Sequence, residues 1–278
     1  MIAMRGRMLW LMVAAVAACG GGSDEAPDTG AHSMRFLGGS GEPPYGDYGV
    51  VIPIAGHAGN IGAGDFTIEM WLKAEPDSLI AWGGCRSAVG EGTSWLEGHV
   101  VLDRTQAGAP SFIGLALFGD AIAFGVGDQD YVEGGVCEPA YFNGGGWHHV
   151  AAVREGTALR VYVDGASTHP LADYQAGDLS YQGAASGGNM ILGGWKARNT
   201  VAPWRGWIDE LRISTVARYP AEPTPDSPLE ADGDTAVLYH FDDIQGSTVL
   251  DSSTADPIDG VRRDSSDWLV KYDAETPF

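Results

Sequence analysis

One carboxylate stands in an unusual setting within the apolar segment 207–213. If this segment is a β-strand, its side chains alternate between two faces, and Asp209 then shares one face with Trp207, Leu211 and Ile213. A buried carboxylate without partners is strongly unfavourable. Asp209 therefore needs a metal ion, a cationic side chain such as an arginine, or backbone donors at a turn, and the residues alone leave these alternatives open.

The other acidic and histidine residues do not form a recognisable catalytic pattern. Hydrolysis of a glycosidic bond needs two carboxyl groups that face one cleft. Glu69 has no acidic residue two positions away on either side, and the side chains of the neighbours Asp209 and Glu210 leave opposite faces of a strand. The adjacent His148 and His149 predict one core-facing and one exposed histidine, and neither His-Glu-x-x-His nor Gly-x-Ser-x-Gly occurs. The sequence therefore favours a protein that is not an enzyme.

Aromatic side chains in glycine-rich or irregular segments offer another kind of chemistry, because exposed rings can stack on sugar rings. The candidates for ligand binding are Trp82, Trp95, Tyr131, Tyr141, Trp195 and Trp204. The acidic pairs in the segments 128–130 and 242–243 lack the spacing of a calcium-binding loop and are expected to be solvated.

The elements that must position these residues are short strands. Residues 66–73 alternate between apolar and polar side chains, which predicts a half-buried strand. Segments 112–118 and 121–126 flank Gly119-Asp120 and predict a hairpin, and segments 147–154 and 159–163 predict a second one. Further strands are expected at 190–192, 207–213 and 236–241. Many short strands without helical spacers predict an all-β fold of two antiparallel sheets packed face to face.

The N-terminal residues indicate where the chain works. Two arginines precede the apolar run 8–18, which ends in small residues directly before Cys19. This pattern resembles a bacterial lipobox and implies that Cys19 carries a lipid anchor on the mature chain. Because glycine follows Cys19, the similarity points to the outer membrane. We therefore expect a signal peptide at 1–18, a flexible tether at 19–33 and a sandwich at 34–278 that includes a C-terminal edge segment.

An extracytoplasmic address favours disulfide formation between the two remaining cysteines, Cys85 and Cys137, although two separate thiols remain the alternative. The formal net charge of −21 repels phosphate backbones, so the sequence excludes nucleic acid as a partner.

Four strand segments occur in order: Asp-Phe-Thr-Ile-Glu-Met-Trp at 65–71, Trp-His-His-Val-Ala at 147–151, Leu-Arg-Val-Tyr-Val-Asp-Gly at 159–165 and Gly-Trp-Ile-Asp-Glu-Leu-Arg-Ile at 206–213. They resemble successive strands of laminin G-like domains in the concanavalin A-like lectin/glucanase superfamily. The resemblance implies an antiparallel jelly-roll β-sandwich. It also implies that Asp209 matches an aspartate that, together with carbonyl groups near the start of the domain, holds a structural Ca²⁺.

The sequence therefore predicts a cell-surface lipoprotein that acts as a non-catalytic recognition or adhesion module. The resemblance favours carbohydrate as the ligand over an extracellular protein. A structural envelope protein without a discrete ligand is the first alternative, and a glycan-cleaving enzyme is the second.

Overall fold

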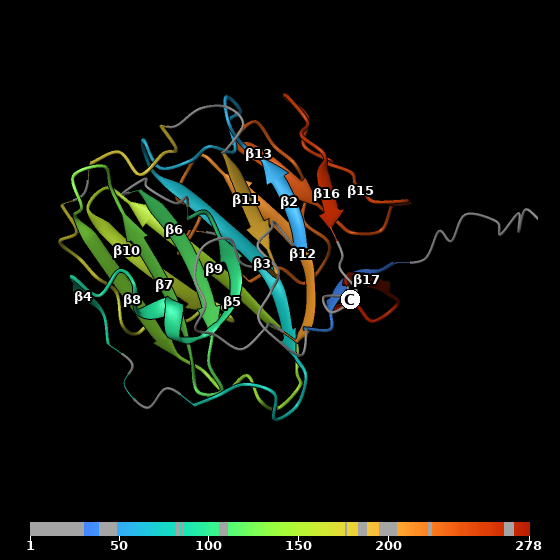
Figure 1. The fold of residues 1–278 in the computed structure, drawn as a ribbon, viewed down its shortest axis with the longest axis horizontal. Helices are drawn as coiled ribbons and strands as arrows, with labels where there is room; N and C mark the ends of the chain where they lie inside the picture. Colours follow the sequence, from blue (N-terminus) through green and yellow to red (C-terminus); the bar gives the residue numbers. More distant parts are fainter. Residues whose placement is uncertain are drawn as a thin grey trace, which may run out of the picture.

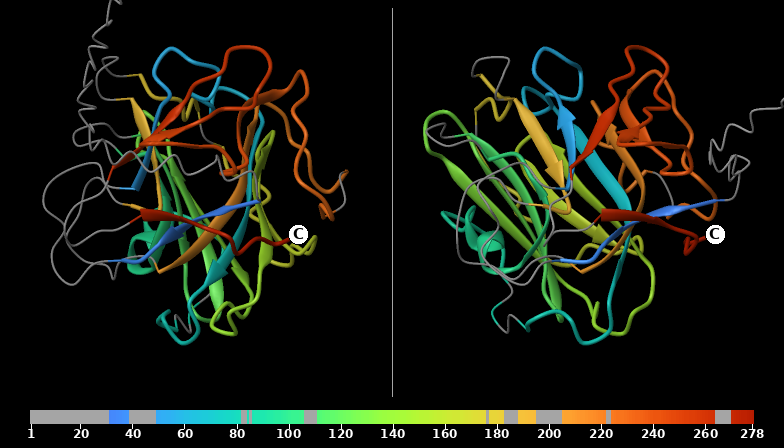
Figure 2. Two further views of the ribbon diagram at one scale, coloured as in Figure 1. Left: turned by 90° about the vertical axis from the view of Figure 1, so that its right-hand side faces the viewer. Right: turned by 45° about the vertical axis from the view of Figure 1, so that its right-hand side comes forward.

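The computed structural model describes two antiparallel β-sheets that lie face to face (Figure 1). The two layers are seen from the side in the left view of Figure 2. The described residues are 31–38, 49–81, 84, 86–105, 111–175, 177–182, 188–194, 205–221, 224–263 and 270–278. The predicted all-β sandwich is confirmed.

The first sheet, called sheet A, contains the first and last strands of the described chain. Its order is β10 (Ala158–Val163), β9 (His148–Glu155), β3 (Phe66–Ala74), β12 (Gly206–Ser214), β1 (Ser33–Phe36) and β17 (Val270–Asp273). β13 (Thr235–Tyr239) also pairs with β12, beyond the part of β12 that pairs with β1. The predicted strand at 236–241 is therefore part of sheet A.

The second sheet, called sheet B, supplies the opposite layer. Its order is β14 (Ile244–Gln245), β15 (Thr248–Val249), β16 (Gly260–Arg263), β2 (Gly49–Pro53), β11 (Asn189–Leu192), β5 (His99–Asp103), β6 (Phe112–Leu117), β7 (Ala121–Gly127), β8 (Glu133–Pro139) and β4 (Ala88–Val89). A short 3-10 helix, η1 (Ser94–Glu97), contacts β6 and β7.

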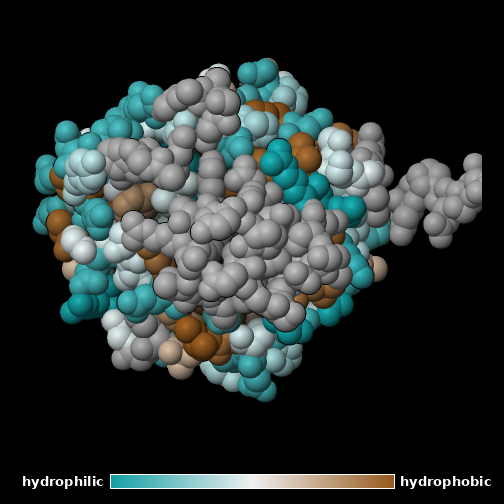
Figure 3. Space-filling view, in the orientation of Figure 1, coloured by the Kyte–Doolittle hydropathy of each residue, from teal (hydrophilic) through white to brown (hydrophobic). Residues whose placement is uncertain are grey.

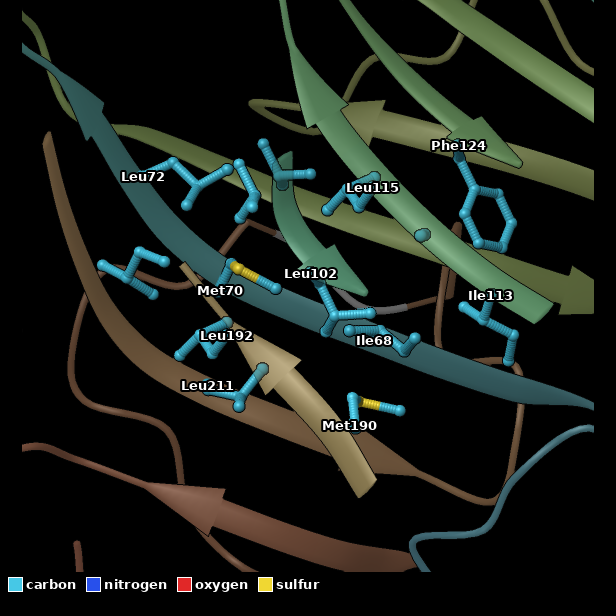
Figure 4. Packing of buried hydrophobic residues seen from close by; sticks show 14 of the residues in the cluster. Ile68, Met70, Leu72, Leu102, Ile113, Leu115, Phe124, Met190, Leu192 and Leu211 are labelled. Atoms are coloured by element: carbon cyan, nitrogen blue, oxygen red, sulfur yellow. The ribbon is translucent and has the colours of Figure 1, made fainter. Parts of the chain in front are cut away.

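The core lies between the sheets. Phe66, Ile68, Met70 and Leu72 alternate along β3 toward sheet B, as the sequence predicts, and they are all buried. They meet the apolar side chains of β5, β6 and β7, and Figure 4 shows Ile68 and Met70 close to residues of these strands. The Phe66 and Phe124 rings meet edge to face with their centroids 6.4 Å apart. This interdigitation is the dominant source of stability for such a fold.

Both predicted hairpins form. β6 and β7 pair from Phe112 opposite Gly127 to Leu117 opposite Ile122, and the Phe118 N–H donates to the Ala121 carbonyl at 2.8 Å. β9 and β10 pair across a turn in which Gly156 has a φ of +56°. Glycine adopts this left-handed conformation without the strain that a side chain would introduce.

The predicted side-chain alternation along residues 207–213 is wrong, because β12 contains a β-bulge. Its register against β3 shifts between Asp209 and Arg212, and Glu210 has a φ of +53°. A bulge adds one residue to a strand and reverses the faces of the side chains beyond it. Ile208 therefore joins Leu211 in the core cluster, and Trp207 and Asp209 lie on the outer face of sheet A.

The outer surface is mixed in character. In the orientation of Figure 1, hydrophobic residues among the coloured part form small patches between hydrophilic ones (Figure 3). Within the described ranges, no helix has the length and apolar character needed to cross a membrane.

Candidate binding site

Two of the predicted aromatic candidates are exposed on loops. The side chain of Tyr131 is 77% exposed and that of Tyr141 is 65% exposed. They flank the two ends of β8, whose seven residues span about 20 Å at roughly 3.3 Å per residue. Tyr131 and Tyr141 therefore belong to different ends of the sandwich and do not share one small binding site.

Tyr141 lies in a well-supported loop cluster. The Gly119 N–H donates to the Ile80 carbonyl at 2.7 Å, and the Phe142 N–H donates to the Gly119 carbonyl at 3.2 Å. Asn143 bonds the backbone of Leu79 through both atoms of its side-chain amide, at 3.0 Å each. These bonds join the loop that carries Tyr141 to the loop that carries Ile80, which is itself 50% exposed.

Trp95 is not available to a ligand, so the expectation that its ring is exposed is wrong. Its side chain is 1% exposed and packs over the outer face of sheet B. A Cβ atom built on Gly114 would lie 2.0 Å from this indole, and one built on Gly125 would lie 2.3 Å from it. The absence of side chains at these two glycines creates the recess that Trp95 fills. Trp82, Trp195 and Trp204 lie outside the described residues.

Asp209 is 3% exposed although the bulge places it on the outer face of sheet A and not on the core face with Leu211 and Ile213. Burial, together with the negative charges of Glu210 and Asp242, raises the pKa of Asp209 to about 9. The backbone N–H of Glu210 donates to its Oδ1 atom at 2.9 Å. This carboxyl group lies beside other acids, an arrangement that a bound cation would stabilise.

The start of the described chain lies at the same place. The backbone N–H of His32 donates to Asp242 Oδ1 at 2.7 Å. Met34 pairs with Ile208, so the antiparallel register brings Ser33 alongside Asp209. The hydroxyl of Ser33 is buried and has no hydrogen-bond partner among the described residues.

These oxygen donors suit a hard cation such as Ca²⁺, which the resemblance implies for Asp209. The prediction of solvated loop acids is wrong for Asp242, which is half-buried and bonded to the start of the domain, and for Asp128, which is 2% exposed. The pattern of the pair 242–243 could not show the bond of Asp242, because the His32 backbone lies 210 positions away in the sequence. Among the described residues, no three or more His, Cys, Asp or Glu side chains are grouped so that they could hold a metal ion. Any Ca²⁺ here would therefore depend on hydroxyl, carbonyl or water oxygens besides the two aspartates.

Glu69 lies in a second buried polar cluster on the outer face of sheet A. It is 0% exposed and accepts hydrogen bonds from Arg212 Nε at 2.6 Å and from the Tyr219 hydroxyl at 2.8 Å. His149 Nε2 lies 3.2 Å from its Oε2 atom. Burial, the largest influence, raises the pKa of Glu69, but the bonds and charges of His149 and Arg212 outweigh it and lower the pKa overall. Because its oxygen atoms are bonded to these three side chains, the carboxylate of Glu69 has a structural role.

The two adjacent histidines differ from the prediction of one core-facing and one exposed ring. His149 is 0% exposed on the outer face of sheet A, because Tyr219 covers it at a centroid distance of 5.6 Å. His148 is partly exposed, and its Nδ1 lies 2.8 Å from Asp164 Oδ2.

Cys137 lies on β8, is buried and takes part in a disulfide bond. Its predicted partner Cys85 lies outside the described residues, as does the predicted lipid attachment residue Cys19. The Cys85–Cys137 pairing stays a prediction.

Two facing antiparallel sheets define a jelly-roll β-sandwich. Residues 49–222 match the laminin G model of the concanavalin A-like lectin/glucanases superfamily. The match covers more than half of the chain, so the protein belongs to this family, as the four strand segments indicate. No curated protein matches the sequence.

Solved structures share this fold at low sequence identity. A Bacteroides ovatus protein described as a "putative carbohydrate binding protein" is 16% identical, with a TM-score of 0.52, over 87% of this chain and 60% of its own. Domains LG4-5 of the mouse laminin alpha1 chain are 15% identical over 78% of this chain and 49% of theirs, with a TM-score of 0.45. The carbohydrate-binding module CBM40 of a Ruminococcus gnavus sialidase is 15% identical over 66% of this chain and 90% of its own, with a TM-score of 0.44. The chain thus spans less than two thirds of the first two proteins.

Proposed function

We propose that the protein is a non-catalytic carbohydrate-binding module and that Tyr141 is the centre of its ligand site. The observation that carries this proposal is the exposed ring of Tyr141, on a loop whose backbone is hydrogen-bonded through Gly119 to the loop of the exposed Ile80. An exposed aromatic face can stack on the apolar face of a pyranose ring, and a loop held by hydrogen bonds loses little entropy on binding. The Bacteroides ovatus neighbour, described as a carbohydrate binding protein, supports the same choice of ligand class.

The buried acids support a role without catalysis. A glycosidase needs two carboxyl groups that reach one substrate. Glu69 is enclosed by Arg212, Tyr219 and His149, and Asp209 is 3% exposed. These two buried acids are therefore poorly placed to reach a glycan.

The proposal includes the outer-membrane location and the Ca²⁺ ion expected from the sequence. Lipidation at Cys19 would place the module on the outer membrane, where an extracellular glycan or protein is within reach. A Ca²⁺ ion bound by Asp209 and Asp242 would be structural, because it would tie β12 to the start of the domain. Incorporation of labelled palmitate in a bacterial host, lost in Cys19→Ala, tests the anchor.

A glycan array tests the ligand class. The probe is the chain from Gly20 onward, which omits Cys19 and keeps every described residue. We expect binding to a subset of glycans. We expect Tyr141→Ala to weaken it by tenfold or more, by analogy with nucleobases, whose stacking on one aromatic side chain contributes about 1–3 kcal/mol. Tyr131→Ala, at the other end of β8, is the matched control. Absence of binding to any glycan would favour the structural envelope protein, and release of reducing sugar from a bound glycan would revive the enzyme.

A further inference from the structure

Two cations are gathered around one indole on the outer face of sheet A. Arg35 on β1 and Lys73 on β3 both pair in register with Trp207 on β12, one from each side. The Arg35 guanidinium lies 4.6 Å from the Trp207 ring centroid and the Lys73 ammonium lies 5.1 Å from it. Cation–π attraction helps to hold both groups over the ring. Arg35 also forms ion pairs with Glu75 at 3.1 Å and with Asp273 at 3.4 Å, so Lys73 is the cation whose partner a ligand can replace.

A second indole lies next to this pair. Trp71 precedes Lys73 by two residues on β3 and shares its face, so the two side chains emerge about 7 Å apart. The Nε1 atoms of Trp71 and Trp207 are buried and have no hydrogen-bond partner among the described residues. Buried donors of this kind are costly unless a ligand or water satisfies them.

The chain's own segment 274–278 occupies this surface. Glu275 forms an ion pair with Lys73. The Phe278 ring meets Trp71 edge to face, at a centroid distance of 5.4 Å and an angle of 82°. The segment thus presents one carboxylate to a cation and one apolar ring to an indole.

A ligand can replace the contacts that segment 274–278 makes. The Glu275 side chain is 42% exposed and Phe278 is 44% exposed, and no residue of the segment belongs to a strand. Partly exposed ion pairs and single ring contacts are weak individually. In contrast, the surface underneath is rigid, since Trp207 is 7% exposed and three paired strands carry its residues.

We propose that the surface formed by Lys73, Trp71 and Trp207 is a binding site for an acidic sugar, a pyranose that carries a carboxylate, and that segment 274–278 closes it as an internal mimic. The sugar carboxylate takes the place of Glu275 on Lys73, and the apolar face of the sugar ring takes the place of Phe278 on Trp71. This proposal rests on the proposed carbohydrate-binding function but adds a second site, on a sheet face instead of the Tyr141 loops.

A closing segment lowers the apparent affinity for a ligand. The measured dissociation constant is the intrinsic one divided by the fraction of molecules whose site is open. If the site is open in about one molecule in ten, removal of the segment strengthens binding tenfold. Salt screens the ion pair of Lys73, so it should weaken both the closed state and the binding of an acidic sugar.

The experiment compares the chain from Gly20 onward with the same chain lacking residues 274–278. Calorimetric titration with an oligosaccharide of galacturonate, and with its neutral galactose counterpart, measures both affinities. We expect the shortened chain to bind the acidic oligosaccharide at least tenfold more tightly than the longer chain, and Lys73→Gln in the shortened chain to abolish the gain. The neutral oligosaccharide should show no gain. Equal affinity of the two chains for the acidic oligosaccharide, or an equal gain for both sugars, overturns the proposal.

Three controls keep the result decisive. If the shortened chain melts at a much lower temperature, the double variant Glu275→Gln with Phe278→Ala replaces it, because it keeps the chain length. Tyr131→Ala, which belongs to neither proposed site, should leave acidic-sugar binding by the shortened chain unchanged. A synthetic Ala-Glu-Thr-Pro-Phe peptide should compete with the sugar for the shortened chain. If the shortened chain binds the peptide but not galacturonate, the segment is only structural and the proposal is overturned. In that case, glycan binding that Tyr141→Ala weakens would still support the proposed function.

Discussion

The substitution Arg212→Met tests the buried cluster around Glu69 most directly. Glu69 is 0% exposed and Arg212 is 6% exposed, so the substitution leaves a buried carboxylate without its cation. Breaking such a pair from one side costs about 3–5 kcal/mol. For a domain of this size each kcal/mol lowers the melting temperature by about 2–4 °C, so we expect a fall of roughly 6–20 °C.

Thermal unfolding followed by circular dichroism measures this change, with Arg160→Met as the matched control. Arg160 pairs with Glu155 at 2.9 Å, but their side chains are 28% and 53% exposed, so its loss should cost at most about 1 kcal/mol. The double variant Glu69→Gln with Arg212→Met should recover part of the stability, because it removes the stranded charge. A fall for Arg212→Met no larger than that of the control would refute the reasoning.

The same cluster predicts a pH dependence with a definite sign. The pKa of Glu69 is lowered in the folded state, so its stabilisation is present above the unfolded pKa of about 4.3 and is lost as the pH falls through the folded pKa. Without Arg212 the carboxyl group takes up a proton more readily. The difference in stability between the original chain and Arg212→Met should therefore shrink between pH 7 and pH 4.

Three other outcomes are expected. Gly114→Ala should destabilise the fold by about 1–3 kcal/mol in denaturant titrations, because its Cβ would overlap a buried indole, whereas Gly64→Ala meets open space and should be near neutral. If Ca²⁺ binds as proposed, EDTA should lower the melting temperature and Asp209→Asn should remove that response; an unchanged melting temperature in chelator contradicts the calcium proposal. Peptide mapping without reductant should recover Cys85 linked to Cys137, and recovery of Cys85 as a free thiol would contradict the pairing.

The inner faces of the sandwich could be predicted from the sequence because their signal is local. In β3, four apolar residues occupy alternate positions, and all four lie in the core between the sheets. The hairpins follow from the turn residues between two apolar runs. The four segments that resemble laminin G-like strands place the chain in its family, and the match over 49–222 confirms this.

The outer faces could not be predicted, because loops distant in the sequence cover them. Trp95 lies in a segment that looks like an exposed loop, but the glycines beneath it make a recess whose depth no local pattern reveals. The β-bulge at Glu210 reverses the faces of β12, and only the register against β3 shows it. His149 alternates outward as a surface residue would, yet Tyr219 closes over it. Strand periodicity predicts which face a side chain is on and does not predict what covers that face.

The antiparallel pairing of β1 with β17 places Ser33 opposite Asp273, so the two ends of the sandwich lie side by side in sheet A (Figure 1). A domain with adjacent ends can be inserted into a surface loop of another protein without forcing that loop apart. The same geometry suits circular permutation, in which a short linker joins the two ends and new ends are opened elsewhere. This sandwich is therefore a practical scaffold for grafting a recognition surface onto an unrelated host.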